Sequence, residues 1–354
     1  MEISFLLEEW YHRHKRDLPW RQTTSPYRIW LSEIILQQTR VNQGLEYYLT
    51  FVAQYPEVEN LANAPLDEVL KRWQGLGYYT RARNLHATAQ YVARDLNGVF
   101  PSSFEGLLKL KGIGNYTAAA IASIAFNEAV AVVDGNVYRV LSRLFGESTP
   151  VNSSAGARVF DMLANRILNR KQPGTHNQAM MELGALVCLP ANPGCSACPL
   201  NTLCVACQTG KTDKFPVRMA KRPARHRYFH YLFIIHDSFT WISQRKEKDI
   251  WHSLFEFPLI ETPGPVQTVD LILTADWKRI TGDCKYAMND KVRTYRHQLT
   301  HQTIFCNFIY ILADSVDAIP ARVYTAVKLT ELHRYAVPRL IDRYLNDLKQ
   351  EGLL

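Results

Sequence analysis

The sequence predicts a multidomain protein in which an all-α domain is followed by a domain of α+β type. At 354 residues the chain exceeds the usual size of one hydrophobic core. Up to about residue 210, apolar residues recur at helical spacing, as at Leu85, Ala89 and Val92. Beyond that point, Tyr228 to His236 and Thr303 to Leu312 are aromatic and β-branched runs, which predict strands.

A short glycine turn interrupts the helices of the first domain. Ser102 and Glu105 form a capping-box pattern, and the helix that they open is expected to reach Leu110. Lys111-Gly112-Ile113-Gly114 then requires a tight turn, and a new helix is expected to begin near Asn115. This pattern predicts a helix-hairpin-helix element.

A basic stretch separates the two domains. Residues 211–227 hold two prolines and many basic side chains without periodic apolar positions, which is typical of a solvated linker. We therefore expect one domain at 1–210 and a second at 228–354. The last segment, Leu329 to Leu348, returns to helical spacing.

The composition favours a nucleic-acid partner. Lys and Arg outnumber Asp and Glu by 41 to 33, and the resulting formal charge of +8 favours an anionic partner. The N-terminus lacks an apolar signal core, and no run approaches the ~20 apolar residues that span a bilayer. We expect a soluble, cytoplasmic protein without a membrane partner.

Four of the seven cysteines lie close together in the sequence: Cys188, Cys195, Cys198 and Cys204. Intervals of six, two and five residues separate them, and such compact spacing indicates a shared metal centre. Zinc is the alternative, but zinc ribbons usually carry two Cys-x-x-Cys pairs and these four cysteines contain one. The remaining three are interpreted as ordinary, partly buried thiols: Cys207, Cys284 and Cys306.

With the glycine turn and Val133-Asp134-Gly135-Asn136, the cysteine array resembles the iron–sulfur members of the helix-hairpin-helix DNA glycosylase superfamily. Four long motifs resemble the MutY-type adenine DNA glycosylases within it: Asp17 to Arg21, Trp30 to Thr39, Gly75 to Tyr79 and Asn177 to Met181. The resemblance covers nearly the whole first domain. It implies a glycosylase domain with a 4Fe-4S cluster held by the four clustered cysteines, which acts in base excision repair on double-stranded DNA. The implied substrate is adenine mispaired with 8-oxoguanine or guanine.

The second domain resembles the Nudix-like C-terminal domain of the same family through Trp251 to Pro258 and Leu299-Thr300-His301. Family members often carry glycines after the tryptophan, where this chain has His252 and Ser253, and Phe-Ser-His in place of Leu299-Thr300-His301. The resemblance implies that Thr300 and His301 read oxidised guanine. The clustered glutamates of Nudix hydrolases are absent from the sequence, so we expect no pyrophosphatase activity.

The resemblance assigns catalysis to two carboxyl groups with assistance from Asn136. Adenine leaves poorly as an anion, so its excision calls for a neutral acid that protonates it and a charged carboxylate beside the sugar cation. Glu33, in an otherwise apolar segment, matches the acid that acts at adenine N7; alone, such a residue is more often solvated at a helix edge. Asp134 matches the carboxylate, and its simpler use is a helix N-cap.

Tyr116 separates two classes of enzyme. Endonuclease III-like relatives place a lysine there, form a Schiff base with the sugar and cut the strand. Because a phenol cannot form that imine, we predict a monofunctional glycosylase in which Tyr116 donates a hydrogen bond. Two alternatives remain: a bifunctional glycosylase and lyase for oxidised pyrimidines, and a non-catalytic iron–sulfur redox sensor bound to DNA.

Further residues are implied in binding DNA, whose target base must be flipped out of the duplex. Gly112 and Gly114 would let backbone N–H groups approach a phosphate, with a monovalent cation completing the site. The others match family positions around the flipped base or in the base stack: Trp20, Arg21, Gln38, Tyr78 and Gln178. We expect the protein to act as a monomer.

Overall fold

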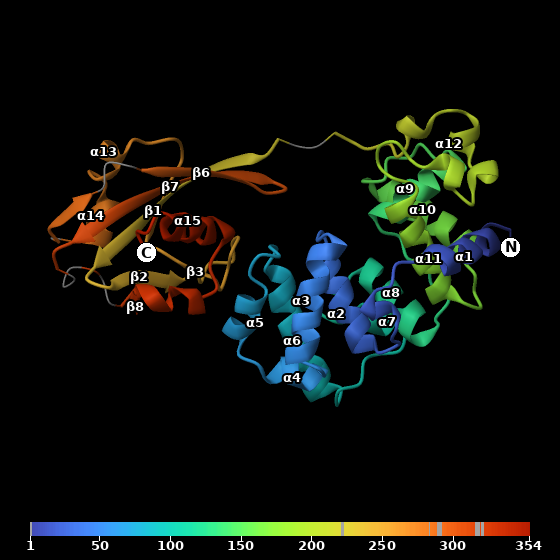
Figure 1. Cartoon of the computed structure of the whole chain (residues 1–354), viewed down its shortest axis with the longest axis horizontal. Coiled ribbons are helices and arrows are strands. Elements are labelled where there is room, and N and C mark those ends of the chain that lie inside the picture. The colour runs from blue at the N-terminus through green and yellow to red at the C-terminus, as the bar shows by residue number, and fades with distance from the viewer. Residues whose placement is uncertain (1, 221–222, 283, 289–291, 316–318, 320–321) are drawn as a thin grey trace. The chain divides into compact units, whose positions relative to one another are not determined.

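The chain forms two compact units (Figure 1). A computed structural model describes residues 2–220, 223–282, 284–288, 292–315, 319 and 322–354. The first unit comprises residues 1–63 and 84–221, and the second comprises residues 64–83 and 222–354. Lys221 and Arg222, within the predicted linker, lie outside the described residues. Among those that are described, none of the helices has the length and apolar character needed to cross a bilayer.

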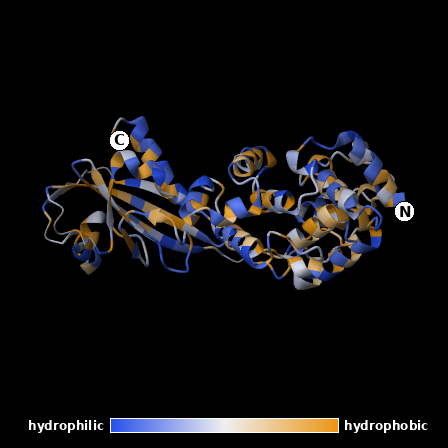
Figure 2. Cartoon of the chain, turned by 90° about the horizontal axis from the view of Figure 1, so that it is seen from below, coloured by the Kyte–Doolittle hydropathy of each residue, from blue (hydrophilic) through white to orange (hydrophobic). Residues whose placement is uncertain are grey.

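The first unit is helical, as predicted. Its α-helices are α1 (Glu2–His14), α2 (Pro26–Leu36), α3 (Val41–Gln54), α4 (Val58–Asn63), most of α6 (Thr80–Asp95), α7 (Phe104–Leu107), α8 (Asn115–Phe126), α9 (Gly135–Phe145), α10 (Ser154–Ile167), α11 (Pro173–Leu186) and α12 (Val205–Gln208). Its 3-10 helices are η1 (Pro19–Arg21), η2 (Cys195–Ala197), η3 (Asn201–Leu203) and η4 (Thr212–Lys214). Figure 2 shows apolar and polar residues alternating around these helices, which is the pattern that lets a helix bury one face.

The predicted glycine turn joins α7 to α8, but the cap prediction was wrong by one residue. Ser103, with extended backbone, caps α7, and its hydroxyl accepts a hydrogen bond from the Gly106 N–H at 3.1 Å. The helix ends at Leu107, before the predicted Leu110, because the next turn tightens into i to i+3 bonds. The new helix begins at Asn115, as expected.

A hydrophobic core holds α9 against α1, α10 and α11. Leu141 of α9 packs in this core with Leu7, Phe160 and Leu183, all of them buried. Three of the clustered cysteines, Cys188, Cys198 and Cys204, pack against the same core. The core therefore ties the cysteine loop to the helix that begins directly after Asp134.

The second unit contains a mixed eight-stranded sheet. Its strands are β1 (Arg225–His236), β2 (Phe239–Gln244), β3 (Phe255–Glu256), β4 (Leu259–Thr262), β5 (Tyr286–Met288), β6 (Arg293–Gln298), β7 (Gln302–Ala313) and β8 (Thr325–Lys328). Its helices are α5 (Leu66–Arg72), α13 (Thr268–Leu271), α14 (Ala275–Thr281), η5 (Leu329–Arg334) and α15 (Arg339–Gln350).

The two strands predicted from aromatic and β-branched runs are the long central pair of this sheet. β1 and β7 run parallel, from Arg225 opposite Gln302 to Ile235 opposite Leu312. Successive side chains of a strand point to opposite faces of the sheet, so both faces present apolar side chains, and helices cover both. On one face Trp277 of α14 joins a core with β1 and β7 residues, and on the other Tyr344 of α15 stacks on Phe308 at 4.1 Å.

The expected C-terminal helix is shorter than predicted. Leu329–Arg334 is a 3-10 helix, and α15 begins only at Arg339. Pro338 explains the break, because a proline pushes the residue before it into an extended conformation. Residues 64–83 belong with this end of the chain: the Lys71 ammonium donates to the Tyr335 carbonyl at 3.0 Å.

Candidate active site

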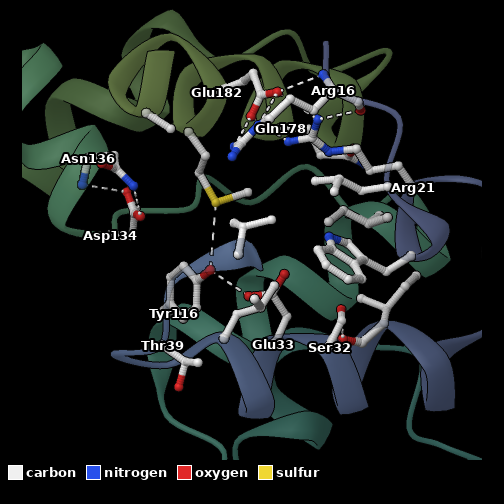
Figure 3. A pocket seen from close by; sticks show the side chains of 18 residues that line it. Arg16, Arg21, Ser32, Glu33, Thr39, Tyr116, Asp134, Asn136, Gln178 and Glu182 are labelled. Carbon is white, nitrogen blue, oxygen red and sulfur yellow. Dashed lines mark hydrogen bonds and ion pairs between the residues drawn. The ribbon is translucent and has the colours of Figure 1, made fainter. Parts of the chain in front are cut away.

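A pocket of about 220 Å³ in the first unit gathers all four predicted catalytic residues (Figure 3). Its walls come from η1, α2, α8, α11 and the start of α9. Seven predicted site residues line it: Trp20, Arg21, Glu33, Tyr116, Asp134, Asn136 and Gln178. A volume below the ~300 Å³ of common ligand pockets suits a compact ligand, such as a single flipped base.

Glu33 is a buried acid in an apolar helix. Glu33 is 7% exposed and lies on α2 directly before the apolar residues Ile34 and Ile35. The Tyr116 hydroxyl donates a hydrogen bond to Glu33 Oε2 at 2.5 Å. Burial raises the pKa of Glu33 to about 7, and the nearby charge of Asp134 adds to the rise. The hydrogen bond from Tyr116 and the positive charge of Arg21 oppose it. The group can therefore carry a proton near neutral pH.

Asp134 is both a helix cap and a wall of the pocket. Its Oδ1 accepts hydrogen bonds from the N–H groups of Asn136 at 2.9 Å and Val137 at 2.7 Å. Its Oδ2 accepts a third from the Asn136 side chain at 2.8 Å. Burial raises the pKa of Asp134, and these three bonds oppose the rise because they favour the charged form. Asp134 is therefore the N-cap of α9, as the simpler interpretation expected, and it also lines the pocket.

Asn136 is held in turn by Arg139, which the sequence analysis did not single out. Arg139 Nη2 donates to Asn136 Oδ1 at 2.8 Å and to the Gly184 carbonyl at 2.7 Å, and its Nε donates to the Cys188 carbonyl at 2.6 Å. A hydrogen-bonded path thus runs from the cysteine loop to Asp134. The signal that the sequence offered for Arg139 was a basic residue between the apolar positions of the helix that becomes α9.

A buried ion triad, also missed, forms another wall. Glu182 accepts two-pronged hydrogen bonds from Arg16 and from Arg21. Burial alone would raise the pKa of Glu182, but the bonds from Arg21 and Arg16 lower it to about 2. These polar groups can orient a base by hydrogen bonding. Arg16 and Glu182 directly adjoin the motifs Asp17 to Arg21 and Asn177 to Met181, which was the signal available.

Gln178 and Trp20 have fixed positions in the pocket wall. Gln178 Oε1 accepts a hydrogen bond from the Tyr11 hydroxyl at 2.7 Å. Trp20 is buried and packs edge-on against Tyr48, with ring centroids 5.1 Å apart. Both side chains are therefore held before any ligand enters.

Three predicted DNA-contact residues of the first unit do not line the pocket. Gln38 is exposed directly after α2, with a φ of +58° that side chains rarely adopt. Gly112 has a φ of +79°, and a Cβ there would lie 2.6 Å from Asn84 Cβ, so the turn requires glycine. Gly114 precedes the first turn of α8, whose N–H groups are available to an anion.

The remaining predicted contacts lie in the second unit. Tyr78 is 48% exposed, and its hydroxyl shares a 2.6 Å hydrogen bond with the hydroxyl of Thr300. Thr300 and His301 are exposed in the turn between β6 and β7, which the bond from the Leu299 N–H to the Gln302 carbonyl closes. The structure thus brings together Tyr78 and Thr300, which the sequence separates widely.

The four clustered cysteines line one small cavity of the first unit, together with Cys207 and Arg143. The buried Arg143 guanidinium donates to Cys188 Sγ at 3.3 Å. Burial raises the pKa of the Cys198 thiol to about 11, so this thiol is neutral at neutral pH unless a bound cation favours its thiolate. In the part of the chain that the structure describes, no three Cys, His, Asp or Glu side chains stand ready to hold a single metal ion. Convergent thiols of this spacing fit a multi-iron cluster better than one zinc ion, whose ligands lie within about 2.3 Å of it.

A helix-hairpin-helix unit whose pocket pairs a protonated acid with a hydrogen-bonded carboxylate defines a class of protein, the DNA glycosylases. Comparisons with known proteins agree with this class. Residues 31–156 match the family described as "HhH-GPD superfamily base excision DNA repair protein", and residues 230–347 match the NUDIX domain. The helical fold is also that of a solved thermostable thymine-DNA glycosylase, with a TM-score of 0.54 and 30% identity over 58% of this chain and 95% of that one. An endonuclease III–DNA intermediate, at 21% identity and a TM-score of 0.51, shares the fold over 58% of this chain and 94% of that one.

Individual relatives narrow the class. The adenine DNA glycosylase of Buchnera aphidicola subsp. Acyrthosiphon pisum is 36% identical over 351 residues, which cover 98% of both chains. The adenine DNA glycosylase of Homo sapiens is 44% identical over 211 residues, covering 57% of this chain and 39% of that protein. The chain belongs to the MutY-type adenine DNA glycosylase family of base excision repair enzymes.

Proposed function

We propose that this chain hydrolyses the N-glycosidic bond of adenine paired with 8-oxoguanine in duplex DNA and leaves the strand intact. The observation that carries the proposal is the buried Glu33, whose pKa near 7 leaves a proton available beside the carboxylate of Asp134. Tyr116 occupies the same pocket and offers a phenol where a lyase needs an amine.

The proposed reaction uses one proton and one water molecule. Glu33 donates its proton to N7 of the flipped adenine. The electron pair of the glycosidic bond then moves onto the purine ring, and adenine leaves as a neutral base. The Asp134 carboxylate stabilises the oxocarbenium ion left on the sugar, and water adds to that carbon. The proton that the water loses restores Glu33, and the product is an abasic site.

The position of Asn136 supports a helper role. Its side chain already donates to Asp134 Oδ2, so it holds the carboxylate in one orientation as charge develops on the sugar. Arg16, Arg21 and Glu182 supply the polar groups that distinguish adenine from other bases, and Gln178 completes that wall.

We propose that the other predicted residues hold the DNA. Gln38 and Tyr78 are exposed and enter the base stack, and Thr300 and His301 contact the 8-oxoguanine opposite the adenine. Gly112 and Gly114 hold a backbone phosphate with a monovalent cation. The proposed working form is an intracellular monomer, with the catalytic domain in the helical first unit, a basic linker after it and the lesion-reading domain in the second unit.

The proposed cofactor is a 4Fe-4S cluster held by Cys188, Cys195, Cys198 and Cys204. When bound, it supplies a covalent cross-link of four thiolates that rigidifies the loop next to α9. Arg139 donates hydrogen bonds to both the Cys188 carbonyl and Asn136 Oδ1, so a rigid loop also restrains Asn136.

Glu33→Gln tests the proposed acid. On a duplex with adenine opposite 8-oxoguanine, the single-turnover rate should fall by at least about 100-fold, because the amide has no proton to donate. Strand breaks should appear only after alkali treatment. A matched control is Glu46→Gln, which removes an exposed carboxyl on α3 and should leave the rate unchanged.

Two results would contradict the proposal. Undiminished adenine release by Glu33→Gln would remove Glu33 as the acid. Breaks without alkali would indicate a lyase. Thermal unfolding distinguishes loss of the acid from misfolding of the variant. At pH 8 Glu33 is largely ionised, and a buried charge is costly, so Glu33→Gln should unfold at an equal or higher temperature than the unchanged protein.

A further inference from the structure

Cys207 stands in the same cavity as the four proposed cluster ligands. All five thiols line it, and each of the five is partly buried. With Cys207 included, the loop contains a second Cys-x-x-Cys pair, Cys204 to Cys207, beside Cys195 to Cys198. Cys207 is partly buried, as expected from the sequence, and it lies among the four proposed ligands.

The backbone fixes the position of Cys207. It lies on the short helix α12, which Ala206 anchors by complete burial. The Gly210 N–H donates to the Cys207 carbonyl at 3.2 Å, and the Lys211 N–H donates to the Ala206 carbonyl at 2.8 Å. The start of this helix and its last turn thus bring two thiols, Cys204 and Cys207, to one cavity.

One of the proposed ligands, Cys195, interacts with the Cys207 thiol. The two side chains line the same small cavity, and Cys207 is the neighbouring thiol with the largest influence on Cys195. The other ligands are tied elsewhere: Cys188 to the Arg143 guanidinium, Cys204 to the Arg143 carbonyl and Cys198 to the Leu200 backbone. Cys195 is therefore the ligand that the Cys207 thiol is placed to replace within this cavity.

We propose that Cys207 is a reserve ligand of the iron–sulfur site, which binds iron in place of Cys195 when that thiolate is lost. The inference rests on the proposed cluster. The exchange is a ligand substitution: one iron–sulfur bond to Cys195 breaks, one to Cys207 forms, and the Cys207 proton leaves to solvent, with no change of oxidation state. The site then keeps four thiolates from five cysteines.

The test compares four full-length variants purified without oxygen: Cys195→Ala, Cys207→Ala, the double variant and Cys198→Ala. Iron, zinc and acid-labile sulfide per chain are measured, with the visible absorption spectrum. Cys195→Ala and Cys207→Ala should each keep the iron and sulfide of the unchanged protein. The double variant and Cys198→Ala should each fall by at least about fivefold, because three thiolates bind a cluster poorly. Electron paramagnetic resonance of the oxidised Cys195→Ala protein should show altered g values, since one ligand has changed.

The outcomes separate the two proposals. If the unchanged protein holds zinc or no iron, the cluster proposal fails. If the unchanged protein holds iron and Cys195→Ala loses it as completely as the double variant, Cys207 is only a neighbour of the ligands and the reserve-ligand proposal is overturned. Because the single and double variants share the loss of Cys195, a general weakness of the loop cannot imitate the expected difference between them.

Discussion

The hydroxyl of Tyr116 donates a 2.5 Å hydrogen bond to Oε2 of Glu33, which joins the first turn of α8 to the buried acid on α2. This bond favours the charged carboxylate, whereas burial favours the neutral acid. Burial is the larger effect, and the pKa of Glu33 rises to about 7. Tyr116 therefore limits how far the pKa of Glu33 rises.

Removal of this bond should move the pH profile. In Tyr116→Phe the charged form of Glu33 loses a donor, so its pKa should rise further, by ~1 unit for a hydrogen bond to a charged group. The rate is high where Glu33 is protonated and falls as pH rises through its pKa. Single-turnover rates on a mispaired duplex, measured across the neutral range, should therefore show the alkaline fall near pH 7 in the unchanged protein and at higher pH in Tyr116→Phe.

The direction of this shift is diagnostic. An unmoved or lowered alkaline limb in Tyr116→Phe would contradict the assignment of that limb to Glu33. Tyr48→Phe is a suitable comparison, because that buried phenol on α3 packs against Trp20 and should leave the limb in place.

Gly184 of α11 should be intolerant of a side chain. A Cβ there would lie 2.6 Å from Asn136 Cβ and 3.1 Å from the Asn136 backbone. Gly184→Ala should push the Asp134–Asn136 turn away, lowering the free energy of unfolding by about 1–3 kcal/mol and the excision rate by tenfold or more. Chemical denaturation and single-turnover assays measure the two effects.

Gly135→Ala is the matched control, because a Cβ at that position meets nothing within 4 Å in the free protein. Its free energy of unfolding should be unchanged or slightly higher, since alanine favours a helix. If both variants lose the same stability, the close contact with Asn136 is not the cause.

Much of the fold was predictable because local patterns carry it. Apolar periodicity and the glycine turn predicted α8, and the two aromatic runs predicted the central strands β1 and β7. The cap at Ser103 was missed because Ser102 and Ser103 are equivalent by residue type, and only the backbone conformation decides which hydroxyl reaches the helix. Long-range packing decided the rest.

The pocket likewise contains some residues that local motifs predicted and others that they did not. Glu33, Tyr116 and Asp134 lie in long motifs, and the structure brings them into one cavity. Arg139 and Glu182 were missed because each acts through a partner far away in sequence: Glu182 meets Arg16 across the fold, and Arg139 meets the Cys188 carbonyl. No local pattern of charges reveals such pairs.

Glu182→Gln should destabilise the first unit by about 2–4 kcal/mol at neutral pH, because two guanidinium groups lose the charge that compensates them. The pKa of Glu182 is lowered to about 2, so this stabilisation is present above the ordinary carboxyl pKa and is lost as pH falls toward 2. The difference in unfolding free energy between the variant and the unchanged protein should therefore shrink below about pH 4. Glu9→Gln, from the exposed pair with Arg13, should cost under ~0.5 kcal/mol at every pH; an equal cost for both would contradict the role of burial.

Ser253 should be improved by glycine. It lies between β2 and β3 with a φ of +66°, a left-handed conformation that L side chains adopt only with strain. Its backbone bonds, from its N–H to the Arg245 carbonyl and from Gln244 to its own carbonyl, would remain in Ser253→Gly. We expect the free energy of unfolding of the second unit to rise by about 0.5–1 kcal/mol in urea denaturation, since relief of strain exceeds the entropy that glycine adds to the unfolded chain. Ser253→Val should have the opposite effect, because a β-branched side chain is the least tolerant of positive φ, and equal stability of the two variants would mean that the backbone at this position is unstrained.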